Sequence, residues 1–125
     1  MIGIDIIKTS RMRSLMERFG TKGLQRFLSE DEIKIVQSYR SAAAYWAVKE
    51  AFSKALGTGI GEECSFKDIK IYKDNRGAPK IALSKRIVKT FNIIDIALSI
   101  THDGEYAIAV VDVKSSSPTN KIKEF

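Results

Sequence analysis

The sequence predicts one α+β domain in which a mostly antiparallel sheet packs against one long helix. Helix signals fill the first half of the chain, alternating strands fill the second half, and the longest helical segment, residues 41–56, ends at a glycine-rich stop. A chain of 125 residues can bury one core but not two. We therefore expect a single domain over residues 1–113 and a loose, polar C-terminal tail over residues 114–125.

The first half is expected to contain one strand and four helices. Ser10 and Ser29 are helix-capping residues, and Glu32 completes a capping box with Ser29. Gly20 and Gly57 are helix stops. The strand is expected over 2–7, and the helices over 10–19, 22–28, 29–39 and 41–56.

The second half is expected to be mainly β-structure. The run Asp-Asn-Arg-Gly at 74–77 is a turn signal between two strands, and Ser84 caps a short helix. The last two strands are joined by the connection at 102–104. The strands are expected over 66–73, 79–83, 94–101 and 105–113, with the helix ending at Phe91.

Composition excludes several classes of protein. No apolar run approaches the roughly 20 residues of a membrane span, and the N-terminus lacks the basic region of a signal peptide. The single cysteine, Cys64, cannot form an internal disulfide, which fits a reducing cytoplasm. The net charge of +6 favours anionic partners, namely nucleic acids, polyphosphate ligands or acidic proteins.

The long helix has two unlike faces. Tyr45 and Val48 lie within about 40° of Phe52 and form a buried stripe, whereas Glu50 lies about 160° from Phe52, beside Lys54. The small residues on the Glu50 side leave room for a ligand to approach (Ala43 and Ala47). The alternative is an exposed ion pair between Glu50 and Lys54, worth a few tenths of a kcal/mol.

The glycines after this helix also allow two interpretations. Gly57, Gly59 and Gly61 stand at every second position, so the backbone could come close to a ligand as phosphate-binding loops do. The same run is equally a helix C-cap followed by a turn.

Asp5 is an isolated acid in an Ile-rich strand. Such a carboxylate must be hydrogen-bonded, exposed at an edge or bound to a cation. If Asp5 and Glu50 meet in space, they supply two hard oxygen ligands of the kind that Mg²⁺ takes. His102 is the only histidine, and one histidine with one cysteine cannot make a structural zinc site.

Four motifs together resemble those of the holo-[acyl-carrier-protein] synthases, the small bacterial phosphopantetheinyl transferases. The most specific is the run Trp-Ala-Val-Lys-Glu-Ala-Phe-Ser-Lys-Ala-Leu-Gly-Thr-Gly-Ile-Gly at 46–61. The others follow in the family's order: Gly-Ile-Asp-Ile at 3–6, Ser-Phe-Lys-Asp-Ile-Lys-Ile at 65–71 with its Asn-x-Gly-x-Pro turn, and Leu-Ser-Ile-Thr-His at 98–102. They span nearly the whole chain apart from the tail.

The resemblance implies a 4′-phosphopantetheinyl transferase-like fold, a homotrimer with active sites between subunits, and a role in fatty acid biosynthesis. It implies Mg²⁺ on Asp5 and Glu50, with Glu50 and Lys54 acting in catalysis. Coenzyme A would be bound by residues at five matching positions: Lys54, Gly57, Gly59, Pro79 and His102. An acidic acyl carrier protein would dock on Arg11 and Arg18.

The implied reaction moves the phosphopantetheine group of coenzyme A to a carrier serine and releases adenosine 3′,5′-bisphosphate. Either Glu50 or a metal-bound water would accept the serine proton. The chain departs from the family pattern at three positions: Met1 replaces a glycine, Ala78 a frequent lysine, and Asp103 a common Thr or Ser. The departure at Asp103 puts a negative charge near an anionic ligand.

Two other functions compete with this one. The basic residues of 11–26 would suit a small nucleic-acid-binding protein, but no RNP, zinc-finger or Lys/Arg-dense arm is present. An inactive trimeric scaffold is hard to reconcile with acids at both Asp5 and Glu50. We therefore expect no nucleic acid and no membrane among the partners.

Overall fold

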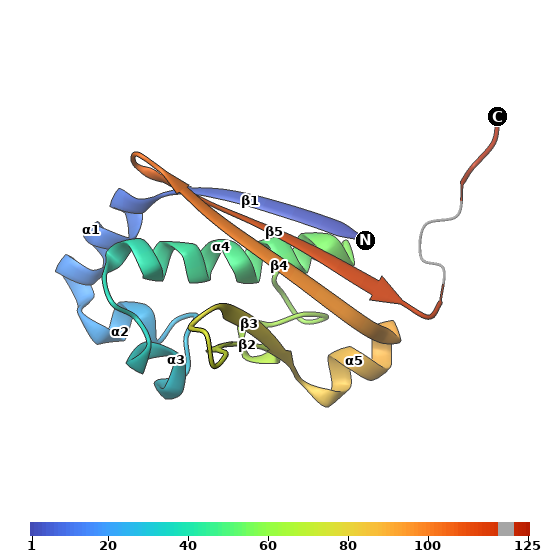
Figure 1. Cartoon of the computed structure of the whole chain (residues 1–125), viewed down its shortest axis with the longest axis horizontal. Helices are drawn as coiled ribbons and strands as arrows, with labels where there is room; N and C mark the ends of the chain where they lie inside the picture. Colours follow the sequence, from blue (N-terminus) through green and yellow to red (C-terminus); the bar gives the residue numbers. More distant parts are fainter. Residues whose placement is uncertain (118–121) are drawn as a thin grey trace.

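Two antiparallel sheets and one long helix make up the fold in the computed structural model, which describes residues 1–117 and 122–125 (Figure 1). The first half contains β1 (Ile2–Lys8), α1 (Thr9–Phe19), α2 (Thr21–Leu24), α3 (Glu30–Lys34) and α4 (Tyr39–Leu56). The second half contains η1 (Phe66–Asp68), β2 (Ile69–Lys73), β3 (Pro79–Leu83), α5 (Lys85–Phe91), β4 (Ile93–Asp103) and β5 (Tyr106–Ser115). The predicted α+β class is confirmed.

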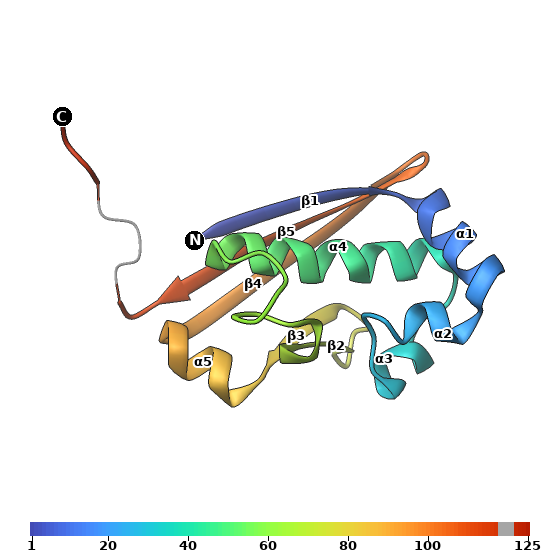
Figure 2. The ribbon, with the colours of Figure 1, turned by 180° about the vertical axis from the view of Figure 1, so that it is seen from behind.

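The long helix α4 is the centre of the molecule. Three strands in the order β1-β5-β4 form one sheet, and β2 and β3 form a separate hairpin. In both views α4 lies between β1 and the β2–β3 hairpin (Figures 1 and 2). Every second residue of β5 from Ala107 to Val113 is fully buried. Alternation along β5 therefore produces the face that covers the helix.

The contact between β1 and α4 is so close that only glycine fits at position 3. A Cβ built on Gly3 would lie 1.8 Å from the carbonyl oxygen of Ala51 and 2.6 Å from the backbone nitrogen of Ala55. Both atoms belong to the helix backbone, so a rotamer change cannot relieve the overlap. The glycine of the Gly-Ile-Asp motif thus sets the distance between strand and helix.

The helices between α1 and α4 are shorter than the sequence pattern indicates. The expected helices over 22–28 and 29–39 are reduced to Thr21–Leu24 and Glu30–Lys34. The capping box is present, with Ser29 N donating to Glu32 Oε1 at 2.9 Å. The chain then turns so that Phe27, Leu28 and Glu32 become buried, and this burial outweighs local helix preference.

Several element ends differ from those expected. The N-cap of α4 is Ser38, and the hydroxyl oxygen of Ser41 accepts the Ser38 N–H at 3.1 Å instead of starting the helix. His102 and Asp103 extend β4, so the expected turn at 102–104 moves to Gly104 and Glu105. The expected strand over 66–73 begins with the 3₁₀ turn η1.

The C-terminal end of the sheet continues past the expected boundary. β5 runs to Ser115, whose hydroxyl donates to the Phe91 carbonyl at 2.6 Å. The predicted loose tail lies partly outside the described residues, since 118–121 are not described; residues 122–125 are exposed coil. The division into a domain over 1–113 and a tail stays a prediction. No helix in the described part of the chain has the length and apolar character needed to cross a membrane.

One buried carboxylate fastens the start of the β2–β3 hairpin. Asp68 accepts hydrogen bonds from Arg86 Nε at 2.9 Å, from the Ser84 hydroxyl at 2.6 Å and from the Ser65 N–H at 2.9 Å. Burial alone would raise the pKa of Asp68, but the bonds from Arg86, Ser84 and Ser65 outweigh it and lower the pKa to about 2.

Replacing Gly3 with alanine tests the close contact between β1 and α4. We expect Gly3→Ala to destabilise the protein by about 1–3 kcal/mol or more, because strand and helix must move apart. Chemical denaturation measures this loss. Gly61→Ala is the matched control, since a Cβ there meets nothing within 4 Å. Equal stability of the two variants would contradict the contact.

Candidate active site

Asp5 and Glu50 come from distant parts of the chain and lie in one neighbourhood. Asp5 shares the inward face of β1 with Gly3 and Ile7, which turns its side chain towards α4, and that side chain is only 13% exposed. Lys54 Nζ, on α4, donates to Asp5 Oδ1 at 2.9 Å and to the Ile4 carbonyl at 3.3 Å. Of the three expected environments for Asp5, the structure therefore shows a carboxylate that is hydrogen-bonded to a cation, the Lys54 ammonium.

Glu50 carries the less compensated charge of the pair. Burial raises the pKa of Glu50, and the charge of Asp5 raises it further, whereas Lys54 and Arg11 lower it. The expected alternative of an exposed ion pair between Glu50 and Lys54 is wrong, since Lys54 pairs with Asp5 across to β1. Two acids and two bases thus gather where β1, α1 and α4 meet.

The small residues on α4 do not leave room for a ligand. Ala43, Ala47 and Ala51 are all completely buried. They lie on a helix that β1, β5 and α1 contact closely. Their small size lets the strand and helix backbones approach, as at Gly3. The expectation that Ala43 and Ala47 open a path to Glu50 is therefore wrong.

The glycines after α4 form a helix C-cap. Gly57 adopts the left-handed conformation with φ 79°, and its N–H donates to the Lys54 carbonyl at 3.0 Å. The N–H of Gly59 donates to the Ser53 carbonyl at 3.2 Å. These donors are already used within the chain, so the structure favours the capping interpretation. Contact of Gly57 and Gly59 with coenzyme A stays a prediction.

His102 and Pro79 line one pocket of about 420 Å³, a volume that suits part of a nucleotide-sized ligand. Its walls come from α4, from the β2–β3 hairpin and from β4, and they include Tyr45. Lys73 and Lys80 add positive charge that the sequence analysis missed. Only the hairpin register, in which Lys73 faces Pro79 and Lys80 faces Tyr72, could have indicated it.

The acid pair and this pocket are separate in one chain. Asp5, Glu50 and Lys54 do not line the pocket that contains His102. The described residues hold no cluster of three His, Cys, Asp or Glu side chains that could bind a metal. Two carboxylates with open positions suit Mg²⁺, which keeps waters and substrate oxygens as further ligands, better than they suit zinc.

The basic residues of α1 extend along the helix from the end nearest Asp5 and Glu50. Arg11 is close enough to lower the pKa of Glu50, and Arg18 lies two helical turns further on the same face. The guanidinium carbons of Arg18 and Arg26 lie 5.1 and 4.5 Å from the centre of the Phe19 ring. Positive charge therefore continues from the acid pair along exposed α1.

Known proteins share both this sequence and this fold. The sequence model of the 4′-phosphopantetheinyl transferase superfamily matches residues 1–111. The chain belongs to the 4′-phosphopantetheinyl transferase superfamily. A holo-[acyl-carrier-protein] synthase from Sulfurimonas denitrificans is 62% identical over 98% of this chain and 100% of its own. The resemblance inferred from the four motifs is thereby confirmed, and the chain is classed as an enzyme with these transferases.

Solved structures agree. The Helicobacter pylori holo-[acyl-carrier-protein] synthase in complex with coenzyme A is 50% identical, with a TM-score of 0.87 over 91% of this chain and 100% of that one. The Bacillus anthracis synthase in complex with coenzyme A (3′,5′-ADP) is 38% identical, with a TM-score of 0.76 over 92% and 96% of the two chains. The fold of these transferases is therefore the fold of this chain.

Removing the charge of Glu50 should stabilise the protein in a metal-free buffer. A carboxyl whose pKa is raised by folding stabilises the folded state fully below its unfolded value, near 4.5, and this contribution is lost as the pH rises through the folded pKa. We expect Glu50→Gln to have a higher Tm than the parent at pH 7 and the same Tm near pH 4. Thermal melts with a chelator measure both. Glu63→Gln, at an exposed position, is the control. A lower Tm for Glu50→Gln at pH 7 would contradict the raised pKa of Glu50.

Proposed function

We propose that this protein transfers 4′-phosphopantetheine from coenzyme A to a serine of an acidic acyl carrier protein, with Mg²⁺ held by Asp5 and Glu50. The main support is the meeting of Asp5 and Glu50 beside Lys54, in a member of the transferase superfamily that is 62% identical to a holo-[acyl-carrier-protein] synthase. We place the activity in the cytoplasm, which fits the single unpaired cysteine, and in fatty acid biosynthesis, as the family resemblance implies.

The residues present fit a magnesium ion. Asp5 and Glu50 offer hard carboxylate oxygens, and a divalent cation would stabilise the charged form of Glu50, whose pKa is raised by burial and then by the charge of Asp5. When bound, the ion would neutralise charge on the pyrophosphate of coenzyme A and so favour attack at phosphorus.

The remaining steps are proton transfer and stabilisation of phosphate charge, which we assign to side chains of this protein. The carrier serine oxygen forms a bond to the β-phosphorus, the bond from that phosphorus to the bridging oxygen breaks, and adenosine 3′,5′-bisphosphate leaves. Either Glu50 or a water beside it would accept the serine proton. The ammonium of Lys54, now on Asp5, supplies positive charge for the phosphates.

The nucleotide half of coenzyme A fits the pocket of His102 and Pro79. Lys73, Lys80 and His102 give it cationic or hydrogen-bonding groups suited to phosphate, and Tyr45 gives it an aromatic side chain. On this proposal the Asp103 carboxylate, at the exposed end of β4, lies outside the pocket lining.

On this proposal a second copy of the chain brings this pocket to an acid pair. The outer face of the β1-β5-β4 sheet is apolar and uncovered: Ile2, Ile4 and Ile6 are 57–72% exposed, and Val110 on β5 lies between Ile4 and Ser99. Such a patch marks an interaction surface. We assign it to self-association into a homotrimer with active sites between subunits.

Arg11 and Arg18 are the proposed docking points for the carrier. Both are exposed on one face of α1, and Arg11 adjoins the acid pair at which the serine must arrive. Positive side chains on an exposed helix accelerate encounter with an acidic partner.

The transfer reaction is tested by mass. Incubation with coenzyme A, Mg²⁺ and an apo carrier protein should add one phosphopantetheine group to the carrier. Asp5→Asn should lower the rate by two or more orders of magnitude. Asp31→Asn, which removes an exposed acid elsewhere, should not. No mass gain with any of several carriers would refute the function, and full activity of Asp5→Asn would refute the metal site.

Self-association is tested at the outer sheet face. Val110→Asp places a charge in the centre of the apolar patch, and we expect light scattering after gel filtration to report monomers, with transfer activity lost. Val88→Asp, on α5, introduces the same charge at another exposed valine and should leave the assembly intact. A trimeric, active Val110→Asp protein would exclude this interface.

A further inference from the structure

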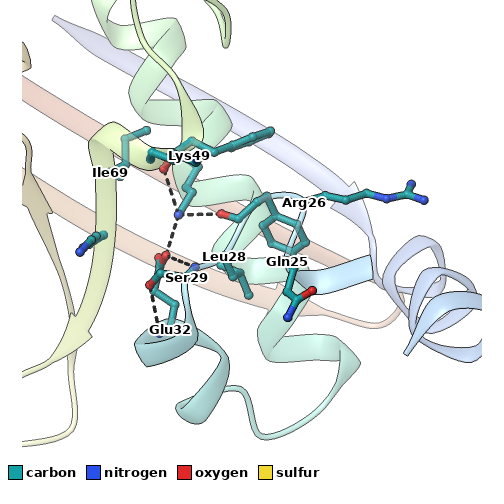
Figure 3. A pocket seen from close by; sticks show the side chains of 11 residues that line it. Gln25, Arg26, Leu28, Ser29, Glu32, Lys49 and Ile69 are labelled. Atoms are coloured by element: carbon teal, nitrogen blue, oxygen red, sulfur yellow. Dashed lines mark hydrogen bonds and ion pairs between the residues drawn. The ribbon is translucent and has the colours of Figure 1, made fainter. Parts of the chain in front are cut away.

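A second ion pair, which the proposed reaction does not use, is formed by Lys49, the residue of α4 directly before Glu50, and Glu32 of α3. Lys49 and Glu32 are each 1% exposed, although charged side chains are rarely buried so completely. Lys49 Nζ donates to Glu32 Oε1 at 2.9 Å, to the Phe27 carbonyl at 2.7 Å and to the Phe66 carbonyl at 3.2 Å (Figure 3). All three ammonium protons therefore have partners.

Glu32 extends this network to the β2–β3 hairpin. Its Oε1 also accepts the Ser29 N–H at 2.9 Å, and its Oε2 accepts the Ile71 N–H of β2 at 3.0 Å. The pair thus joins α4 to α3, to the start of η1 and to the middle of β2. These elements meet nowhere else through so many buried polar bonds among the described residues.

Stability alone does not explain this arrangement. Taking two charges out of water costs several kcal/mol per ion, and neutral residues of similar size are often equally stable in such places. Burial lowers the pKa of Lys49, while its hydrogen bond to Glu32 and the Glu32 charge raise it again. Unlike an apolar contact, each hydrogen bond of the pair has a defined geometry. Each bond therefore fixes the position of one segment relative to α4.

The hairpin needs such a fixing point. Within the described residues, β2 and β3 pair only with each other and share no ladder with the β1-β5-β4 sheet, so no strand register there sets their position. Asp68 holds one end of β2, and Glu32 holds its middle through Ile71. The same hairpin supplies Lys73, Pro79 and Lys80 to the pocket that faces α4.

We infer that the Lys49–Glu32 pair is a positioning element that sets the β2–β3 hairpin against α4 and thereby shapes the nucleotide pocket. This inference rests on the proposed function in so far as that pocket holds the nucleotide half of coenzyme A. Because Lys49 directly precedes Glu50, one turn of α4 fixes the hairpin on one side and presents the candidate metal ligand on the other.

The test is the neutral double variant Glu32→Gln/Lys49→Met, which avoids leaving one buried charge unpaired. Hydrogen exchange of the full-length protein should accelerate about tenfold for amides of residues 69–83 and remain unchanged in β4 and β5. The KM for coenzyme A should rise about five- to tenfold, while kcat and the KM for the carrier stay within about twofold. Asp31→Asn/Lys34→Met, which removes an exposed pair, is the matched control and should change nothing.

Two outcomes overturn the inference: unchanged exchange in residues 69–83, or exchange that rises equally throughout the chain. If the double variant does not fold, Glu32→Asp, which keeps the opposite charge for Lys49 on a shorter side chain, should show the same pattern with smaller changes. Hydrogen exchange needs no activity. If the parent protein transfers no phosphopantetheine, the proposed function is refuted, but hydrogen exchange still tests whether the Lys49–Glu32 pair positions the hairpin.

Discussion

The contact between Gly3 on β1 and the backbone of α4 is the constraint on which the site depends. Because a Cβ at position 3 would lie 1.8 Å from the Ala51 carbonyl, the strand and helix backbones touch without side chains between them. Asp5 follows two residues later on the same face, so its carboxylate reaches the helix where Lys54 can bond it. α1 starts directly after β1, which brings Arg11 within electrostatic reach of Glu50. A single close contact therefore assembles four charged groups from three elements.

Local patterns predicted those parts of the fold that local chemistry controls. The Ser29 capping box, the Ser84 cap, the 74–77 turn and the strand at 79–83 are all where the sequence indicated them. The helix expected over 29–39 ends at Lys34: Glu32 within α3 is buried against Lys49, and no local pattern encodes that partner. Tertiary burial decided the length of the helix.

The same difference separates the predicted and missed parts of the site. Helical geometry placed Glu50 opposite the Phe52 stripe, yet it could not show that Lys54 reaches Asp5 across the sheet edge instead of Glu50 along the helix. Alanines are ambiguous in a sequence, since they suit a close strand as well as a ligand, and here they suit the strand. Lys73 and Lys80 become pocket residues only through the register of a hairpin and its distance from α4.

The charges around Asp5 and Glu50 suit the replacement of one cation by another. Lys54 is half exposed and satisfies Asp5, whereas Glu50 is left with burial and the Asp5 charge against it. A divalent cation would relieve both carboxylates at once, and the ammonium of Lys54 would then be free to pair with phosphate oxygens. On the proposed mechanism, Lys54 thus neutralises Asp5 in the free protein and the pyrophosphate in the complex. The acid pair would thus have a cation beside it in both states, Lys54 in the free protein and the metal ion in the complex. The described residues provide no cluster with a third acidic side chain.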